Sequence, residues 1–211
     1  MKWSDKYFPQ SLDEYVFSSE QDKAKIELWI QKNYLSDCLL FGVAGTGKTT
    51  FAKLIPRLLG ISEFDMLFLD ASQDFSKAFI NTSLDRFIQG TTNRRVVVID
   101  EADELSKAKQ KTLMSLITKW SKFGISFIIC ANDGSKIDTP LHSRCAGRTF
   151  CTSTPDEVRF VKRLFDILDI EKIKYDNEDV LQVHDCFYPR LRDAIDHLEQ
   201  WAMSGTLILP P

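Results

Sequence analysis

The glycine-rich segment 42–49, with the sequence GVAGTGKT, constrains the fold of this chain more than any other feature. It follows the apolar run 38–41 and precedes a segment with helical periodicity that extends to Leu59. A strand, a glycine loop and a helix in this order form a phosphate-binding loop. Small residues let backbone N–H groups approach phosphate oxygens closely, and the helix N-terminus adds a favourable dipole. The chain is therefore predicted to bind a nucleoside triphosphate.

The individual residues of this loop have different expected tasks. Lys48 is expected to reach the β- and γ-phosphates, and Thr49 is expected to coordinate Mg²⁺. A glycine-rich turn with an ordinary surface lysine is the alternative, but the flanking strand and helix favour a phosphate site. The loop residues expected to hold ATP are Gly42, Ala44, Gly45, Thr46, Gly47, Lys48, Thr49 and Thr50.

Composition limits the class of protein. A chain of 211 residues with 44% hydrophobic residues is long enough for one medium domain, or for a domain with a small appendage. It contains neither a signal peptide nor a run of eighteen apolar residues, so we expect a cytoplasmic protein. The five cysteines lack metal-binding spacing, which implies neither zinc nor a disulfide. The net charge of −3 means that any nucleic-acid surface must be a local patch.

The hydrophobic pattern predicts an α/β fold with a parallel sheet. Buried strands are expected at Cys38–Phe41, Met66–Leu69, Val96–Ile99 and Ile125–Cys130, with a short fifth strand at Arg148–Phe150. Helices are expected between them, at Gln21–Gln31, Thr49–Leu59, Ser76–Ile88 and Lys107–Trp120. Alternating strands and helices of this kind give a five-stranded parallel sheet that is flanked by helices.

The last third of the chain is predicted to be entirely helical. Thr154 is expected to cap a helix, with Pro155 at its first position and Glu157 completing a capping box. Further helices are expected at Glu178–His184 and from Pro189 to about Met203. We therefore expect an α/β domain at residues 1–151 and a small all-helical domain at residues 152–211.

Polar side chains follow two of the predicted strands. Asp100 and Glu101 come after an aliphatic strand, where Asp100 is expected to hold Mg²⁺ and Glu101 to activate water. Two acids that simply cap the next helix are the alternative. Asn132 ends the next strand, where it is expected to contact the γ-phosphate or the attacking water, unless Asn132-Asp133-Gly134 is an ordinary turn.

Four further segments give the chain a resemblance to a known family. Residues 143–145 read Ser-Arg-Cys, and residues 101–103 match the end of an Asp-Glu-Ala-Asp box. Residues 6–14, KYFPQSLDE, are similar to a Lys-Tyr-Arg-Pro-x-x-Leu-Asp-Glu opening, and residues 187–195, FYPRLRDAI, resemble a lid helix with a sensor arginine. On these residues the chain resembles the small subunits of AAA+ clamp loaders, which are replication factor C-like, and in particular those of T-even-type phages. The resemblance covers nearly the whole chain.

The resemblance implies a function in DNA replication. It implies an AAA+ ATPase domain followed by a lid domain, and an ATP- and Mg²⁺-dependent ATPase that helps to load a sliding clamp onto primer-template DNA. The implied partners are other clamp-loader subunits in a homo- or hetero-oligomeric pentameric ring, the sliding clamp and the DNA. Arg144 would act in trans at a neighbour's γ-phosphate, and Arg192 would touch the γ-phosphate in cis and report it to the lid. A surface arginine in a loop is the alternative for Arg144.

Two substitutions depart from the family pattern. Phe8 stands in place of the arginine of the opening motif, where it either stacks or merely packs. Met114 stands where related subunits often carry a DNA-facing arginine. The remaining candidates for DNA phosphate contacts are Lys107, Lys109 and Lys111, and a solvated helix face explains these lysines equally well.

Several alternatives remain open at this point. Related subunits carry a third, collar domain, whereas this sequence stops at Pro211. The chain is then a fragment, has its collar on another chain, or assembles through its ATPase modules alone. The alternative functions are another DNA-associated AAA+ ATPase, such as a helicase loader or a branch-migration motor, and a scaffold that binds ATP without hydrolysing it.

Overall fold

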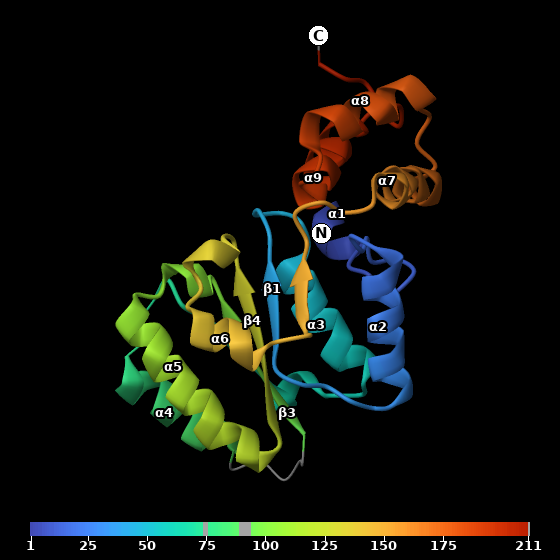
Figure 1. Ribbon diagram of the computed structural model, residues 1–211. Helices are drawn as coiled ribbons and strands as arrows, with labels where there is room; N and C mark the ends of the chain where they lie inside the picture. The colour runs from blue at the N-terminus through green and yellow to red at the C-terminus, as the bar shows by residue number, and fades with distance from the viewer. Residues whose placement is uncertain (74–75, 89–93, 211) are drawn as a thin grey trace.

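Apolar β-branched and aliphatic runs form a five-stranded sheet with the strand order β2-β3-β4-β1-β5, in which every pairing is parallel. The computed structural model describes residues 1–73, 76–88 and 94–210 (Figure 1). The strands are β1 (Cys38–Phe41), β2 (Met66–Asp70), β3 (Arg95–Asp100), β4 (Ile125–Ala131) and β5 (Thr149–Cys151). The predicted parallel α/β sheet is therefore confirmed, with strand bounds within one residue of those expected.

The strand register determines which loops become neighbours. Leu39 of β1 pairs with Ile129 of β4, and Val97 of β3 pairs with Phe127 on the other side of β4. The segments that follow β1, β3 and β4 consequently leave the sheet at the same edge. Ligands of parallel α/β sheets bind at this carboxyl edge, so the predicted phosphate loop, acids and Asn132 all lie there.

Helices cover both faces of the sheet, because parallel strands with near-continuous apolar runs expose apolar side chains on both faces. Val96 and Val98 of β3 face α2 (Glu20–Gln31) and α3 (Lys48–Leu58). Val97 and Ile99 belong to the opposite cluster, with α4 (Lys77–Ile88), α5 (Lys107–Trp120) and α6 (Thr139–Arg144) (Figure 1). The sequence did not predict α6 or the N-terminal α1 (Trp3–Lys6), since neither is long enough to show helical periodicity.

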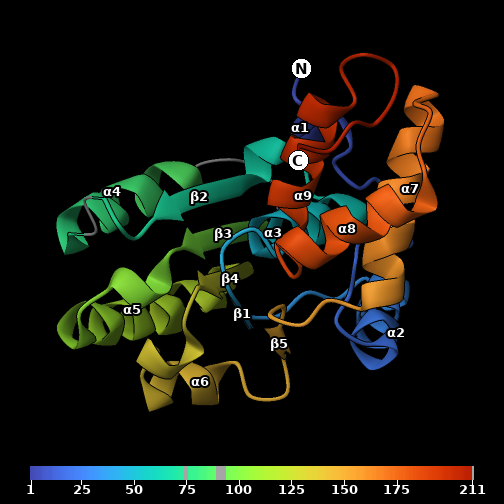
Figure 2. The same ribbon diagram turned by 90° about the horizontal axis from the view of Figure 1, so that it is seen from above.

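Three helices lie beyond the carboxyl edge of the sheet (Figures 1 and 2). They are α7 (Glu157–Glu171), α8 (Asn177–Phe187) and α9 (Leu191–Trp201). The predicted cap of α7 was wrong. Asp156 is the N-cap residue, and its side chain accepts a hydrogen bond from the Arg159 backbone N–H at 2.8 Å. Pro155 accordingly precedes the cap instead of starting the helix, because the Asp156 carboxylate, two residues beyond Thr154, supplies the acceptor.

The N-terminal segment connects the sheet to these helices. Trp3, Tyr7 and Val16 pack in the same apolar cluster as α7, α8 and α9, whereas Phe8 packs against the sheet and α3. The Tyr7 hydroxyl also donates to Oε1 of Glu171 at 2.6 Å. The division into domains at residues 151 and 152 remains a prediction, and the first predicted domain contributes side chains to the core of the second.

Within the described ranges, no helix combines the length and the apolar character that crossing a membrane requires.

Candidate nucleotide-binding and hydrolysis site

The loop between β1 and α3 spans residues 42–47 and leads directly into α3. Gly47 precedes the helix in the left-handed conformation, with φ of 97°, which glycine adopts without steric cost. The Thr46 hydroxyl donates to the Val43 carbonyl at 2.9 Å and lies 2.7 Å from Oγ1 of Thr152, which is buried. The loop is thus held in shape by a contact with the segment after β5.

Gly42 leaves no room for a side chain. A Cβ atom there would lie 2.4 Å from Oγ1 of Thr152 and 2.8 Å from the backbone N of Ser153. We expect Gly42→Ala to lower the free energy of unfolding by about 2–4 kcal/mol in urea denaturation, because the backbone must move. Gly60→Ala is the control, since Gly60 also has positive φ (+72°) but nothing lies within 4 Å of its Cβ position. The control is expected to lose about 1 kcal/mol, and equal losses for both variants would contradict the steric explanation.

Lys48 is the first residue of α3, and its side chain contacts the start of the loop. Its Nζ donates to the carbonyls of Gly42 at 2.6 Å and Val43 at 3.0 Å, and to Oδ1 of Asn132 at 3.0 Å. Burial lowers the pKa of the Lys48 amine, while Asp100 and other nearby groups act in the opposite direction. The structure therefore brings Lys48 and Asn132 together, because they follow the neighbouring strands β1 and β4.

Thr49 and Asp100 form the second pair. The Thr49 hydroxyl donates to Oδ2 of Asp100 at 2.8 Å. Neighbouring ligands of an octahedral Mg²⁺ are separated by roughly 2.9 Å when each lies 2.0–2.1 Å from the ion. The two oxygens therefore fit a magnesium ion. The described residues contain no group of three or more His, Cys, Asp or Glu that would hold a metal alone, so the remaining ligands would come from phosphate oxygens and water, as is usual for Mg²⁺.

Glu101 has a strained backbone. Its φ of 55° and ψ of 37° lie in the left-handed region, which residues other than glycine adopt infrequently. Such strain concentrates at functional sites. Glu101 is exposed, and together with Asp70 and Asp100 it borders a hollow of about 190 Å³ at the carboxyl edge of the sheet. A water molecule in this hollow would have a carboxylate beside it.

Asp103 has a role that the sequence did not reveal. Its buried carboxylate accepts hydrogen bonds from the backbone N of Asn132 at 2.8 Å and of Asp133 at 3.3 Å. It therefore fixes the end of β4 and, with it, the Asn132 amide. The sequence signal was the acid at the end of the box in residues 101–103, but its partner is too distant in sequence to be recognised from spacing.

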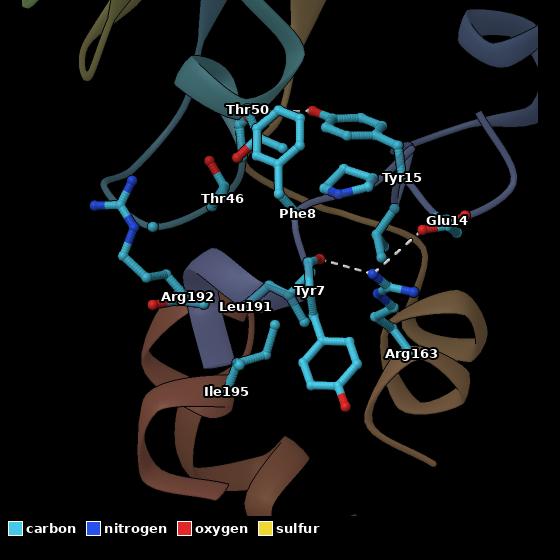
Figure 3. Close-up of a pocket in the computed structure, with 15 residues that line it drawn as sticks. Tyr7, Phe8, Glu14, Tyr15, Thr46, Thr50, Arg163, Leu191, Arg192 and Ile195 are labelled. Carbon is cyan, nitrogen blue, oxygen red and sulfur yellow. Dashed lines mark hydrogen bonds and ion pairs between the residues drawn. The ribbon is translucent and has the colours of Figure 1, made fainter. Parts of the chain in front are cut away.

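A pocket of about 80 Å³ lies between the N-terminal segment, the phosphate loop and the helices beyond the sheet (Figure 3). Aromatic and aliphatic side chains line it together with polar ones. The apolar residues are Tyr7, Phe8, Pro9, Tyr15, Val16, Leu191 and Ile195, and the polar side chains include Glu14, Thr50, Arg163 and Arg192. One guanidinium N–H of Arg163 donates to the Tyr7 carbonyl at 2.8 Å and thereby fixes the N-terminal segment (Figure 3).

Phe8 packs in two directions at this pocket. Besides lining the pocket, its ring lies 5.4 Å below the guanidinium carbon of Arg57, on α3. A cation over an aromatic face is favourable. Arg57 does not border the pocket, and its Nη2 donates to Oε1 of Glu63 at 2.6 Å.

The first turn of α9 contacts the phosphate loop directly. The Arg192 backbone N donates to the Gly45 carbonyl at 3.2 Å, and the Arg192 side chain lies beside the loop near Thr46 (Figure 3). Its charge contributes to the lowered pKa of Lys48. A Cβ at Gly45 would lie 3.3 Å from Cβ of Arg190, so the loop and α9 are in close contact. The sequence prediction of Arg192 as a sensor is compatible with this position.

Arg144 lies apart from this group. It is in the last turn of α6, where its side chain contacts Asp37, just before β1, and Ser121, just after α5. These contacts are at the amino end of β1, opposite the phosphate loop. Within one chain, Arg144 therefore does not contribute to the site, and the predicted role in trans stays a prediction.

The predicted DNA contacts lie on the surface of α5. Lys107, Lys109 and Lys111 are exposed in its first turns, whereas Met114 packs against the core. Cations near a helix N-terminus oppose the helix dipole. These lysines therefore do not stabilise the start of α5 through its dipole.

Comparison with known proteins identifies the family. The family described as "ATPase family associated with various cellular activities (AAA)" matches residues 38–153. The replication factor C small subunits of Staphylothermus marinus and Haloarcula marismortui are both 30% identical to the chain, over 96% and 98% of its length. Replication factor C subunit 4 of Saccharomyces cerevisiae is 28% identical over 99% of the chain. The chain spans 62–65% of the length of these relatives.

Solved structures show the same fold. The Thermotoga maritima RuvB Holliday junction branch migration motor has a TM-score of 0.70 at 21% identity, covering 94% of this chain and 65% of its own. A variant of it reaches 0.74 at 18% identity, with 93% and 66% covered. At these sequence identities, the structural similarity shows a shared fold only. Because the family match spans more than half of the sequence and contains the phosphate loop, the two acids and Asn132, the chain belongs to the AAA family of ATPases.

Proposed function

We infer that this chain is the ATPase module of a clamp-loader small subunit, which helps to open a sliding clamp and to load it onto primer-template DNA. The similarity to replication factor C small subunits over nearly the whole chain supports this function. The nucleotide is ATP with Mg²⁺. The cytoplasmic location that the sequence predicts stays a prediction.

The observation that carries the hydrolytic part of this proposal is the convergence of Lys48, Asn132, Thr49 and Asp100 at one edge of the sheet. When ATP binds, the Lys48 amine donates to phosphate oxygens instead of to the carbonyls of Gly42 and Val43. The backbone N–H groups of the loop hold the same phosphates. Thr49 and Asp100 hold Mg²⁺, which neutralises phosphate charge when bound. Glu101 accepts a proton from the attacking water, which Asn132 helps to orient.

The other predicted residues act between elements or between subunits. Arg192 contacts the γ-phosphate and couples it to the helices beyond the sheet, because its backbone already contacts the loop. Arg144 supplies positive charge to the site of a neighbouring subunit. The lysines of α5 contact DNA phosphates, which explains cations at a helix N-terminus where the dipole disfavours them.

The test is ATP hydrolysis measured against protein concentration, with and without primed DNA and the sliding clamp, at two salt concentrations. We expect the specific rate to rise steeply with concentration, and clamp and primed DNA together to stimulate it, more strongly at low salt. Stimulation by branched DNA with indifference to the clamp would favour a branch-migration motor. ATP binding without hydrolysis under every condition would favour a scaffold.

A further inference from the structure

Arg144 is held at the edge of a hollow on the side of the sheet opposite the phosphate loop. Its Nε–H donates to Oδ2 of Asp37 at 2.8 Å, and its Nη2 donates to Oγ of Ser121 at 2.9 Å. The hollow measures about 390 Å³ and is bordered by both partners. An arginine has four rotatable side-chain bonds, so two contacts of this kind restrict it to few orientations.

Asp37 is itself firmly anchored. Its side chain is only 9% exposed, and Oδ1 accepts a hydrogen bond from the backbone N of Phe127 at 3.0 Å. Arg148 donates from Nε to the Asp37 carbonyl at 2.9 Å and from Nη2 to the Arg144 carbonyl at 2.7 Å. The carboxylate therefore connects β1, β4 and the end of α6 at a fixed point.

Part of the guanidinium has no hydrogen-bond partner among the described residues. Arginine has five N–H donors, and the hydrogen bonds between described residues use two of them. The side chain is 32% exposed. A fork that is fixed by one edge and open at the other is suited to bind an oxyanion brought by another molecule.

We propose that Asp37 is a positioning residue for Arg144: it fixes the guanidinium so that the open edge meets the terminal phosphate of a nucleotide bound to a second copy of this chain, with Ser121 as the second support. This inference rests on the proposed function. Asp37 touches neither nucleotide nor phosphate. It acts through the orientation of Arg144, and small misplacements of a group that stabilises a transition state reduce rates strongly.

Asp37→Asn and Ser121→Ala test the proposal. Asp37→Asn keeps the size of the side chain but leaves one acceptor oxygen for two donors, the Phe127 backbone N–H and the Arg144 Nε–H. At concentrations where hydrolysis is assembly-dependent, we expect kcat for ATP to fall about 10- to 100-fold for Asp37→Asn, and less for Ser121→Ala. The KM for ATP should not change, since the nucleotide pocket in the same chain is intact. Thr118→Ala is the control, because Thr118 is exposed on α5 and its hydroxyl donates to the Met114 carbonyl of the same helix. Its kcat should equal that of the unmodified chain.

A double variant and a mixture separate positioning from misfolding. Asp37→Asn in an Arg144→Ala background should cause no further loss. Asp37→Asn mixed with Lys48→Ala chains should regain activity, because the Lys48→Ala chains offer a correctly held Arg144 to intact phosphate loops. Additive losses, or a mixture without recovery, would overturn the proposal.

The positioning of Arg144 by Asp37 can also be tested independently of the proposed function, by a measurement on the unassembled chain. In ¹⁵N NMR of the arginine side chains, the Arg144 Nε–H signal should be protected from exchange and should lose this protection in Asp37→Asn. An unchanged signal would refute positioning by Asp37. If protection is lost as expected but Arg144→Ala hydrolyses ATP at the normal rate in the assembled state, the trans role of Arg144 fails, and the proposal fails with it.

Discussion

Replacing Glu101 by glutamine is expected to stop ATP turnover while ATP binding remains. Glutamine keeps the size of the side chain and its ability to hydrogen-bond, but it is not basic enough to accept a proton from water. General-base catalysis contributes about 10²–10⁴-fold in rate, so we expect kcat to fall at least about 100-fold. The Kd for ATP is measured by fluorescence with a labelled nucleotide. It should stay within about 3-fold of the unmodified value, because Glu101 contributes at most one contact to ATP binding.

Glu104→Gln is the matched control for this experiment. Glu104 is an exposed glutamate close to Glu101 in sequence, and it does not border the hollow beside Asp100. Its substitution should leave both kcat and the Kd for ATP unchanged. A Glu101→Gln chain that hydrolyses ATP at the normal rate would remove Glu101 from the mechanism and would require another acceptor, for which Asp70 in the same hollow is a candidate.

Replacing Arg144 by alanine is expected to reduce hydrolysis about 1000-fold, the lower end of the effect of an arginine supplied in trans. ATP binding by each chain should persist, because Arg144 lies away from the phosphate loop of its own chain. The decisive measurement is a mixture of Arg144→Ala chains with Lys48→Ala chains. Each is inactive alone, but an Arg144→Ala chain next to a Lys48→Ala chain has an intact phosphate loop and receives an intact arginine.

Recovery of hydrolysis in this mixture would show that the arginine and the loop act from different chains. The absence of recovery, with both variants folded and assembled, would contradict the role in trans. Lys122→Ala serves as the control for a lost positive charge on the same side of the molecule, since Lys122 is exposed and does not border the hollow around Arg144. Its hydrolysis rate should not change.

The sequence was sufficient where a function depends on a continuous segment. The phosphate loop needs small residues at fixed spacings and a helix directly after it, and both properties are visible in residues 42–59. The acids Asp100 and Glu101 follow a strand that its aliphatic residues reveal. These features could be predicted because backbone geometry within a few residues determines them.

The wrong and the missing predictions have a different origin. Asp156 instead of Thr154 caps α7 because several acceptors near a helix start compete, and the local pattern does not rank them. Helices α1 and α6 were missed because four and six residues are too few to display a period. The N-terminal segment was matched as a motif, but its packing against both the sheet and the helices beyond it could not be seen in the sequence.

The sequence alone predicted the individual elements of the site: a nucleotide loop, two acids, an amide and the parallel sheet that carries them. Their relation to one another required the fold. Lys48 and Asn132, Asp103 and Asn132, and Asp37 and Arg144 are each far apart along the chain, and each meets within 3.0 Å. Sequence periodicity encodes which face of an element is apolar, but it does not encode the order of strands in the sheet. That order results from the packing of the whole core, and it places Asn132, which follows β4, beside Lys48, which follows the neighbouring strand β1.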